Sequence, residues 1–142
     1  MEKSAGVAEM SAVVAANRAF YHALEERDIA LMDDVWCHED RATCVHPGWR
    51  RLDGWIEIRR SWDAIFRNTD AWAVACKRER VVIEGDQAWV TCVEEIRPPS
   101  QDGSQALQME ATNIFVRRQD AWRLVHHHAS PSPDAPDPGS VN

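Results

Sequence analysis

The feature of this sequence that most constrains its fold is a change of hydrophobic period near Trp72. Before this residue, apolar side chains recur every three or four positions, which is typical of amphipathic helices. After it, long β-rich runs follow one another with only short turns between them. The sequence therefore predicts one α+β domain, with helices in the N-terminal half and an antiparallel sheet in the C-terminal half.

Three helices and a short strand are predicted before Trp72. The helices have apolar residues at helical spacing, Asp28 is placed to cap the second one, and Pro47-Gly48 would end the strand. The expected elements are a helix over 8–26, a helix over 29–36, a strand over 42–46, and a helix that Asp53-Gly54 opens and that ends near Asn68.

Four strands joined by short turns follow, and this pattern favours an antiparallel meander. A twisted sheet of this size with three helices on one face curls, so we expect a cone-shaped domain with an internal apolar pocket. The domain should span residues 1–130. Residues 131–142, which hold four prolines and no apolar period, should form a disordered tail. The expected strands cover 73–83, 87–97, 105–117 and 121–130.

Composition narrows the possible partners. The net charge of -7 and the pI near 5.3 argue against nucleic acid, since phosphate binding needs a basic patch. No apolar run approaches the roughly 20 residues that span a bilayer, and the N-terminus lacks the pattern of a signal peptide. The cysteines show no metal-type spacing, so we expect reduced thiols in a cytoplasmic protein without a metal or cofactor.

Four segments carry a resemblance to a known family: Glu25-Glu26-Arg27-Asp28, Ala42 to Pro47, Asp53-Gly54-Trp55, and Ala121 to Ser130. In this order and spacing the chain resembles the nuclear transport factor 2-like superfamily, which includes ketosteroid isomerases and SnoaL-like polyketide cyclases. The last segment is also similar to the last strand of the association domain of calcium/calmodulin-dependent kinase. The resemblance implies the same α+β cone, on a scaffold that hosts enzymes, transport factors and assembly domains.

The resemblance to ketosteroid isomerases implies a first set of site residues. His46 stands where those enzymes have a general-base aspartate, also followed by proline, and imidazole has a suitable pKa for a base. The structural alternative is a partly buried histidine bonded to a backbone carbonyl. Phe20 replaces the tyrosine that donates to the oxyanion, while Tyr21, about 100° further around the helix, should point elsewhere. Thr112 or Asn113 replaces the second, acidic donor, so steroid isomerisation itself is not expected.

The triple histidine should divide between two faces, because successive side chains of a strand point to opposite sides. Alternation alone would place His126 and His128 inside, together with Trp122. The resemblance instead places His127 in the pocket and the other two histidines on an outer face where subunits pair. We follow the resemblance and expect a homodimer interface at Trp122, His126 and His128. His46 and His127 are only two ligands, so we expect no metal site.

Aromatic and acidic residues complete the expected site. Trp62 matches a position that lines the isomerase pocket and Trp49 should lie at its rim, although core packing explains either ring equally well. Glu94-Glu95 places one carboxylate on each face of its strand. One of them can enter the pocket and pair with a histidine, but a solvated edge is the favoured interpretation. The two arginines of the kinase association domain are replaced by Asn113 and Ala129, which disfavours a strongly anionic ligand.

Two classes of function fit these residues. The first is a small-molecule-binding SnoaL-like protein, possessing isomerase- or cyclase-type chemistry on a small apolar, carbonyl-bearing compound, with His46 as general base. Its ligand would contact Phe20, Trp49, Trp62, Asn113 and His127. The alternative is a non-catalytic ligand-binding or dimerisation module. Catalysis requires His46 and at least one donor to converge on a point about 3 Å from each.

Overall fold

The computed structural model describes residues 2–99 and 106–133 of the chain. Three helices and six strands follow one another as α1, α2, β1, β2, α3 and then β3 to β6. The predicted α+β class is confirmed, with the helices in the N-terminal half and the long strands in the C-terminal half. Residues 134–142, the greater part of the predicted tail, lie outside the described residues, and Pro131 is the last residue of β6.

The helices are α1 (Glu2–Glu26), α2 (Ile29–Val35) and α3 (Trp55–Asn68). Arg27 ends α1 in a left-handed conformation, with φ of 55°. Asp28 then starts α2 as predicted, because its side chain accepts hydrogen bonds from the backbone N–H groups of Ala30 at 2.9 Å and Leu31 at 3.4 Å. This break turns the chain sharply, so α2 lies against α1.

The sheet contains six strands in the order β2-β1-β6-β5-β4-β3. The four long strands form the predicted antiparallel meander. β1 pairs with β6 in the parallel direction, so the sheet as a whole is mixed rather than purely antiparallel. The strands are β1 (Thr43–Val45), β2 (Leu52–Asp53), β3 (Ala73–Glu84), β4 (Gln87–Arg97), β5 (Leu107–Arg118) and β6 (Ala121–Pro131).

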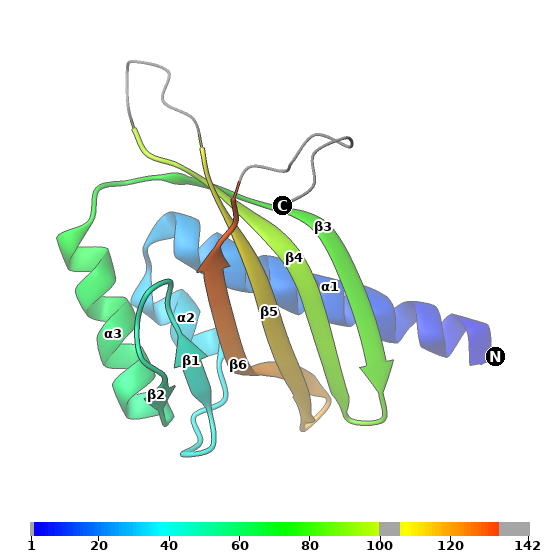
Figure 1. Ribbon diagram of the computed structural model, residues 1–142. Helices are drawn as coiled ribbons and strands as arrows, with labels where there is room; N and C mark the ends of the chain where they lie inside the picture. Colours follow the sequence, from blue (N-terminus) through cyan, green and yellow to red (C-terminus); the bar gives the residue numbers. More distant parts are fainter. Residues whose placement is uncertain (1, 100–105, 134–142) are drawn as a thin grey trace, which may run out of the picture.

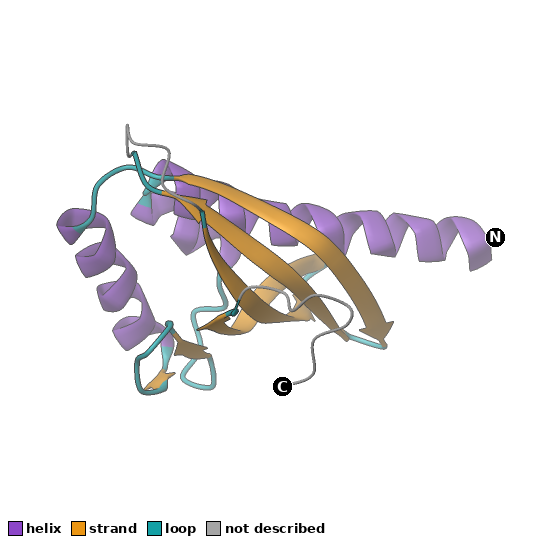
Figure 2. Cartoon of the chain, turned by 45° about the horizontal axis from the view of Figure 1, so that its top comes forward, coloured by secondary structure: helices purple, strands orange, loops and turns teal. Residues whose placement is uncertain are grey.

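The sheet curves around the helices (Figure 1). α1 crosses one face of it, and α2 and α3 lie at the end where β1 and β2 extend the sheet (Figure 2). We call the face that α1 crosses the helix-side face and the opposite one the outer face. The helix-side face holds the core, whose fully buried members include Phe20, Met32, Ile58, Phe115 and Leu124.

An extra residue in β6 shifts which side chains face the core. β5 and β6 pair as Phe115 with Leu124 and then Ile114 with His126, so Val125 has no partner and forms a bulge. Before the bulge Leu124 points to the core, and after it His127 does. Alternation and resemblance gave opposite predictions for this strand, and each is right on one side of Val125.

Candidate functional site

A cavity of about 260 Å³ lies between α3 and the strands β4 to β6. Four of the predicted site residues line it, namely His46, Trp49, Trp62 and His127. Its wall is otherwise almost entirely apolar, with one further ionisable group, Glu94. The remaining lining residues are Leu24, Pro47, Ile65, Trp72, Ile96, Pro98, Leu107 and Met109.

Two predicted residues lie behind the cavity wall. Phe20 is fully buried, with its ring centre 4.7 Å from that of His127 and 5.8 Å from that of Trp62. It therefore supports the two rings that line the cavity. Asn113 is also fully buried and reaches the site only through its hydrogen bond to His127.

His46 is held by a hydrogen bond that occupies its Nε2. This atom lies 2.8 Å from the hydroxyl of Ser61, which donates its own hydrogen to the carbonyl of Ile58 at 2.6 Å. Ser61 must therefore accept from His46, so Nε2 carries the hydrogen and Nδ1 does not. Burial lowers the pKa of His46 to about 4. The imidazole is neutral at pH 7, wedged between Trp49 and Trp62 at ring-centre distances of 4.7 and 4.5 Å.

His127 sits at the inner end of the cavity and is bound from behind. Its Nδ1 lies 2.6 Å from Oδ1 of Asn113. Asn113 in turn donates from Nδ2 to Oδ1 of Asn17 at 2.9 Å and to the hydroxyl of Tyr21 at 3.0 Å. Burial lowers the pKa of His127 well below its ordinary value, and the neighbouring His46 lowers it further, so this ring is neutral as well.

Glu94 brings a carboxyl group into the same cavity. Its Oε2 accepts a hydrogen bond from the Tyr21 hydroxyl at 2.8 Å and lies 3.7 Å from Nε2 of His127. Burial raises the pKa of Glu94 to about 7, and the bond from Tyr21 offsets only part of this effect. At neutral pH the cavity thus presents a carboxyl group that holds a proton in part of the molecules, facing a neutral imidazole.

Two predictions about these residues were wrong. Tyr21 does not point away from the site, because α1 is buried over a wide arc and both Phe20 and Tyr21 face the interior. Glu94 does not lie at a solvated edge. The sequence carried a signal for it, since Glu94 continues the buried alternation of Ala88, Val90 and Cys92 along β4. A carboxyl group in such a series is expected to be either paired or shifted in pKa.

The mouth of the cavity is apolar and partly open to solvent. Trp49 is 46% exposed and Leu107 is 53% exposed, and both line the cavity. Large exposed apolar residues beside an apolar cavity are typical of an entrance for a ligand of the same character.

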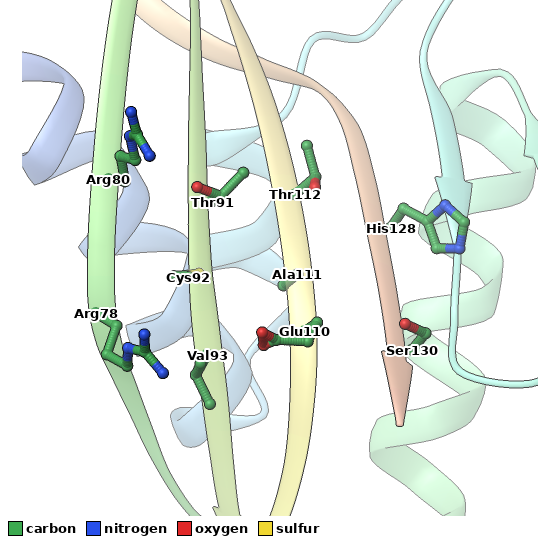
Figure 3. A pocket seen from close by; sticks show the side chains of 10 residues that line it. All are labelled: Arg78, Arg80, Thr91, Cys92, Val93, Glu110, Ala111, Thr112, His128 and Ser130. Carbon is green, nitrogen blue, oxygen red and sulfur yellow. The ribbon is translucent and has the colours of Figure 1, made fainter. Parts of the chain in front are cut away.

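The outer face of the sheet carries a second hollow, of about 510 Å³ (Figure 3). Arg78 and Arg80 of β3 face it, with Glu110 of β5 and His128 of β6 further across. His126 shares this face, its ring centre 6.2 Å from that of His128. The full lining is Arg78, Arg80, Thr91, Cys92, Val93, Glu110, Ala111, Thr112, His128 and Ser130.

Trp122 does not share the outer face with His126 and His128. It is only 8% exposed, and the guanidinium of Arg117 lies 4.6 Å above its ring on the helix side. The bulge at Val125 explains the difference, because it puts Trp122 in phase with Leu124 rather than with His128. The three residues predicted for one interface are therefore on opposite faces.

Within the described part of the chain, no three His, Cys, Asp or Glu side chains converge as metal ligands would. Among residues 2–99 and 106–133, no helix is both long and apolar enough to cross a membrane.

A curved sheet packed against three helices defines a class of small α+β proteins, and comparison places the chain within it. The model of the SnoaL-like domain family matches residues 13–135, and the chain belongs to this family. Among solved structures, a candidate dehydratase of the NTF2-like family from Streptomyces avermitilis is 34% identical. The match has a TM-score of 0.77 and covers 88% of this chain and 97% of that one.

Other relatives include an association domain and an F-box protein. A candidate calcium/calmodulin-dependent protein kinase type II association domain from Thiobacillus denitrificans is 29% identical, with a TM-score of 0.78 over 84% of this chain and 94% of that chain. The F-box protein SKIP8 of Arabidopsis thaliana is 28% identical over 119 residues, which make up 84% of this chain and 49% of that protein. The chain thus spans about half the length of the curated relative that it matches.

Proposed function

We propose that the protein is a proton-transfer enzyme of the isomerase or dehydratase type, acting on a small, mostly apolar compound that carries a carbonyl group. The observation that carries this proposal is the pair formed by Glu94 and His127, 3.7 Å apart in an apolar cavity. The dehydratase relative at 34% identity supports the same reaction class.

The pair can move a proton without creating an isolated charge. In the resting state His127 is neutral and Glu94 holds a proton in part of the molecules at pH 7. Nε2 of His127 takes a proton from the carbon next to the carbonyl, while the Glu94 carboxyl gives its proton to the carbonyl oxygen, and an enol forms. The two side chains become an ion pair at contact distance, which favours the charged product state in a low-dielectric cavity.

The same pair serves an elimination. Where the substrate carries a hydroxyl group β to the carbonyl, the Glu94 proton leaves with that hydroxyl as water while His127 removes the α proton. A proton returned at a different carbon gives an isomer instead. General acid–base catalysis of this kind contributes about 100-fold to 10,000-fold in rate.

His46 is a weaker candidate for the base than the sequence predicted. Its Nε2 donates to Ser61 and its ring lies between Trp49 and Trp62, whereas Nε2 of His127 lies 3.7 Å from the Glu94 carboxyl. We assign it to the cavity wall, where it separates Trp49 from Trp62.

Hydrogen exchange into a ketone tests this assignment without knowledge of the natural substrate. Incubated with 2-tetralone in D₂O, the wild-type protein is expected to speed α-deuteration, followed by NMR. Glu94→Gln and His127→Gln should each lower the rate about 100-fold or more, and His46→Gln should change it only a few-fold. Loss of exchange in His46→Gln alone would restore His46 as the base. Tight binding of 2-tetralone with no exchange would instead favour a non-catalytic binding protein.

As a second candidate role, we propose that the protein associates as a homodimer through the outer face of the sheet. The hollow between Arg78 and His128 leaves this face available, and association domains are among the relatives. This role is compatible with the first, because the cavity lies on the other face.

A further inference from the structure

We propose that Glu79 fixes the tautomer of His127 through two buried asparagines, so that the cavity presents a bare Nε2, and that the ligand therefore reaches this atom with a hydroxyl group. This inference rests on the proposed function only in taking the cavity as the ligand site, and the hydroxyl-bound state is a binding mode distinct from the one in which Nε2 takes a proton from carbon.

The series of hydrogen bonds begins at Glu79, in the bulged part of β3. Its side chain is 16% exposed, with the guanidinium of Arg18 3.6 Å away. A carboxylate accepts hydrogen bonds and has none to donate. Nδ2 of Asn17 lies 3.1 Å from Oε2 of Glu79. The amide of Asn17 must therefore turn its nitrogen toward Glu79 and its oxygen inward.

The inward oxygen of Asn17 determines the next amide. It accepts from Nδ2 of Asn113 at 2.9 Å, and the second hydrogen of that nitrogen goes to the hydroxyl of Tyr21 at 3.0 Å. Asn113 is fully buried and turns its Oδ1 toward His127. An amide oxygen can only accept, so the hydrogen in the 2.6 Å contact belongs to Nδ1 of His127.

A neutral imidazole carries one hydrogen, so Nε2 of His127 is left with a lone pair in the cavity. The ring is 2% exposed, and the Tyr21 hydroxyl already uses its hydrogen on Glu94. A ligand that reaches this end of the cavity satisfies Nε2 only with an O–H or N–H group. A hydroxyl fits these mostly apolar surroundings best.

Glu79 and the two asparagines are thus positioning residues, which act on the ligand only through His127. The tautomer is measurable by NMR on ligand-free protein labelled with ¹⁵N-histidine, because a ring nitrogen with a hydrogen resonates far upfield of one without. The His127→Gln spectrum identifies the signals of His127. We expect the wild type to show hydrogen on Nδ1 and none on Nε2.

Reversing the charge at residue 79, where the series of hydrogen bonds begins, should reverse the tautomer of His127, where the series ends. Glu79→Lys presents a donor, so Asn17 turns its oxygen outward, Asn113 follows, and Nδ2 of Asn113 then donates to Nδ1 of His127. The matched control is Glu110→Lys, the same charge change at an exposed residue of the outer face. We expect hydrogen on Nε2 in a large share of Glu79→Lys molecules, and the wild-type spectrum in Glu110→Lys.

Ligand preference tests the second half of the proposal. At pH 8, calorimetry should show wild-type protein binding 2-tetralol about tenfold more tightly than 2-tetralone, which lacks the hydroxyl, and Glu79→Lys should lose this preference.

Hydrogen on Nε2 in the wild type would overturn the proposal even if no variant folds. An unchanged tautomer in folded Glu79→Lys would show that Glu79 does not fix the tautomer of His127. Equal binding of 2-tetralol and 2-tetralone would overturn the proposed preference for a hydroxyl group. None of the NMR results depends on turnover. Failure of the exchange assay would therefore contradict the proposed function without contradicting the tautomer of His127.

Discussion

Glu94 illustrates how far one residue can set the pH response of this protein. The carboxyl group is 3% exposed, and burial raises its pKa from 4.5 to about 7. Between these two values the folded protein holds a proton that the unfolded chain has released. The stability that Glu94 contributes is therefore complete below pH 4.5 and is lost as the pH rises through about 7.

We predict that Glu94→Gln removes the loss of stability that Glu94 causes as the pH rises. The unfolding free energy of the variant relative to wild type should rise by up to about 3 kcal/mol between pH 4.5 and pH 8, measured by urea denaturation. Glu95→Gln is the matched control on the neighbouring residue. Hydrogen bonds from Lys77 lower the pKa of Glu95, with Arg97 adding to the effect, so the stability of this variant relative to wild type should stay nearly constant above pH 4.5 and rise only as the pH falls below it. The same pH trend in both variants would contradict a specific effect of the cavity.

At the scale of secondary structure, Arg27 joins the ends of two helices. It closes α1 in the left-handed region, and its guanidinium caps the C-terminal end of α3 by donating to the Thr69 hydroxyl at 2.6 Å, the Asp70 carbonyl at 2.9 Å, and the carbonyls of Phe66 and Thr69. These carbonyls have no partner within the helix. One side chain therefore fixes α3, which carries a cavity wall, to the end of α1.

Two variants of Arg27 separate the backbone effect from the capping effect. Arg27→Ala should lower the unfolding free energy by about 1.5–3 kcal/mol, because charged hydrogen bonds are lost. Arg27→Gly should be about 1 kcal/mol more stable than the alanine variant, since glycine tolerates positive φ. Both values come from urea denaturation. Arg67→Ala removes an exposed α3 arginine paired with Asp63 at 2.8 Å and should cost less than about 1 kcal/mol. Equal stability of the alanine and glycine variants would contradict a left-handed Arg27.

The elements show which parts of the fold the sequence could predict. Helical and strand periods are local, so α2, α3 and the four long strands were predicted to within a few residues. β2 has only two residues, and a segment this short shows no hydrophobic period in the sequence. The parallel pairing of β1 with β6 joins segments about 80 residues apart, and no local pattern records it.

The candidate site was predictable where the residues next to a side chain in the sequence determine its orientation. His46 follows a short strand and precedes proline, and the structure places it in the cavity as the resemblance implied. His127 needed the resemblance, because the bulge at Val125 breaks the alternation. The tautomers depend on Ser61 and Asn17, which come from distant parts of the chain. Only the folded hydrogen-bond network contains that information.

At the scale of the whole molecule, the proposed homodimer gives a prediction of the mass in solution. A homodimer built on the outer face should have twice the chain mass of 16.1 kDa by light scattering at neutral pH. Thr91→Glu, on the side of the sheet opposite the cavity, should shift the mass toward the monomer by placing a charge in the interface, and should leave exchange into 2-tetralone unchanged. The matched control is Ser11→Glu, on the exposed side of α1. A monomer mass for the wild type would rule out this interface.

The aromatic wall of the cavity also determines how the molecule interacts with light. Trp49, Trp62 and Trp72 all line it, and the first of these is half in solvent. Indole emission shifts to shorter wavelength when water is displaced from around the ring. An apolar molecule that enters the cavity and displaces water from Trp49 should therefore shift the tryptophan emission of the protein to shorter wavelength. Binding of the ligand can be followed by intrinsic fluorescence.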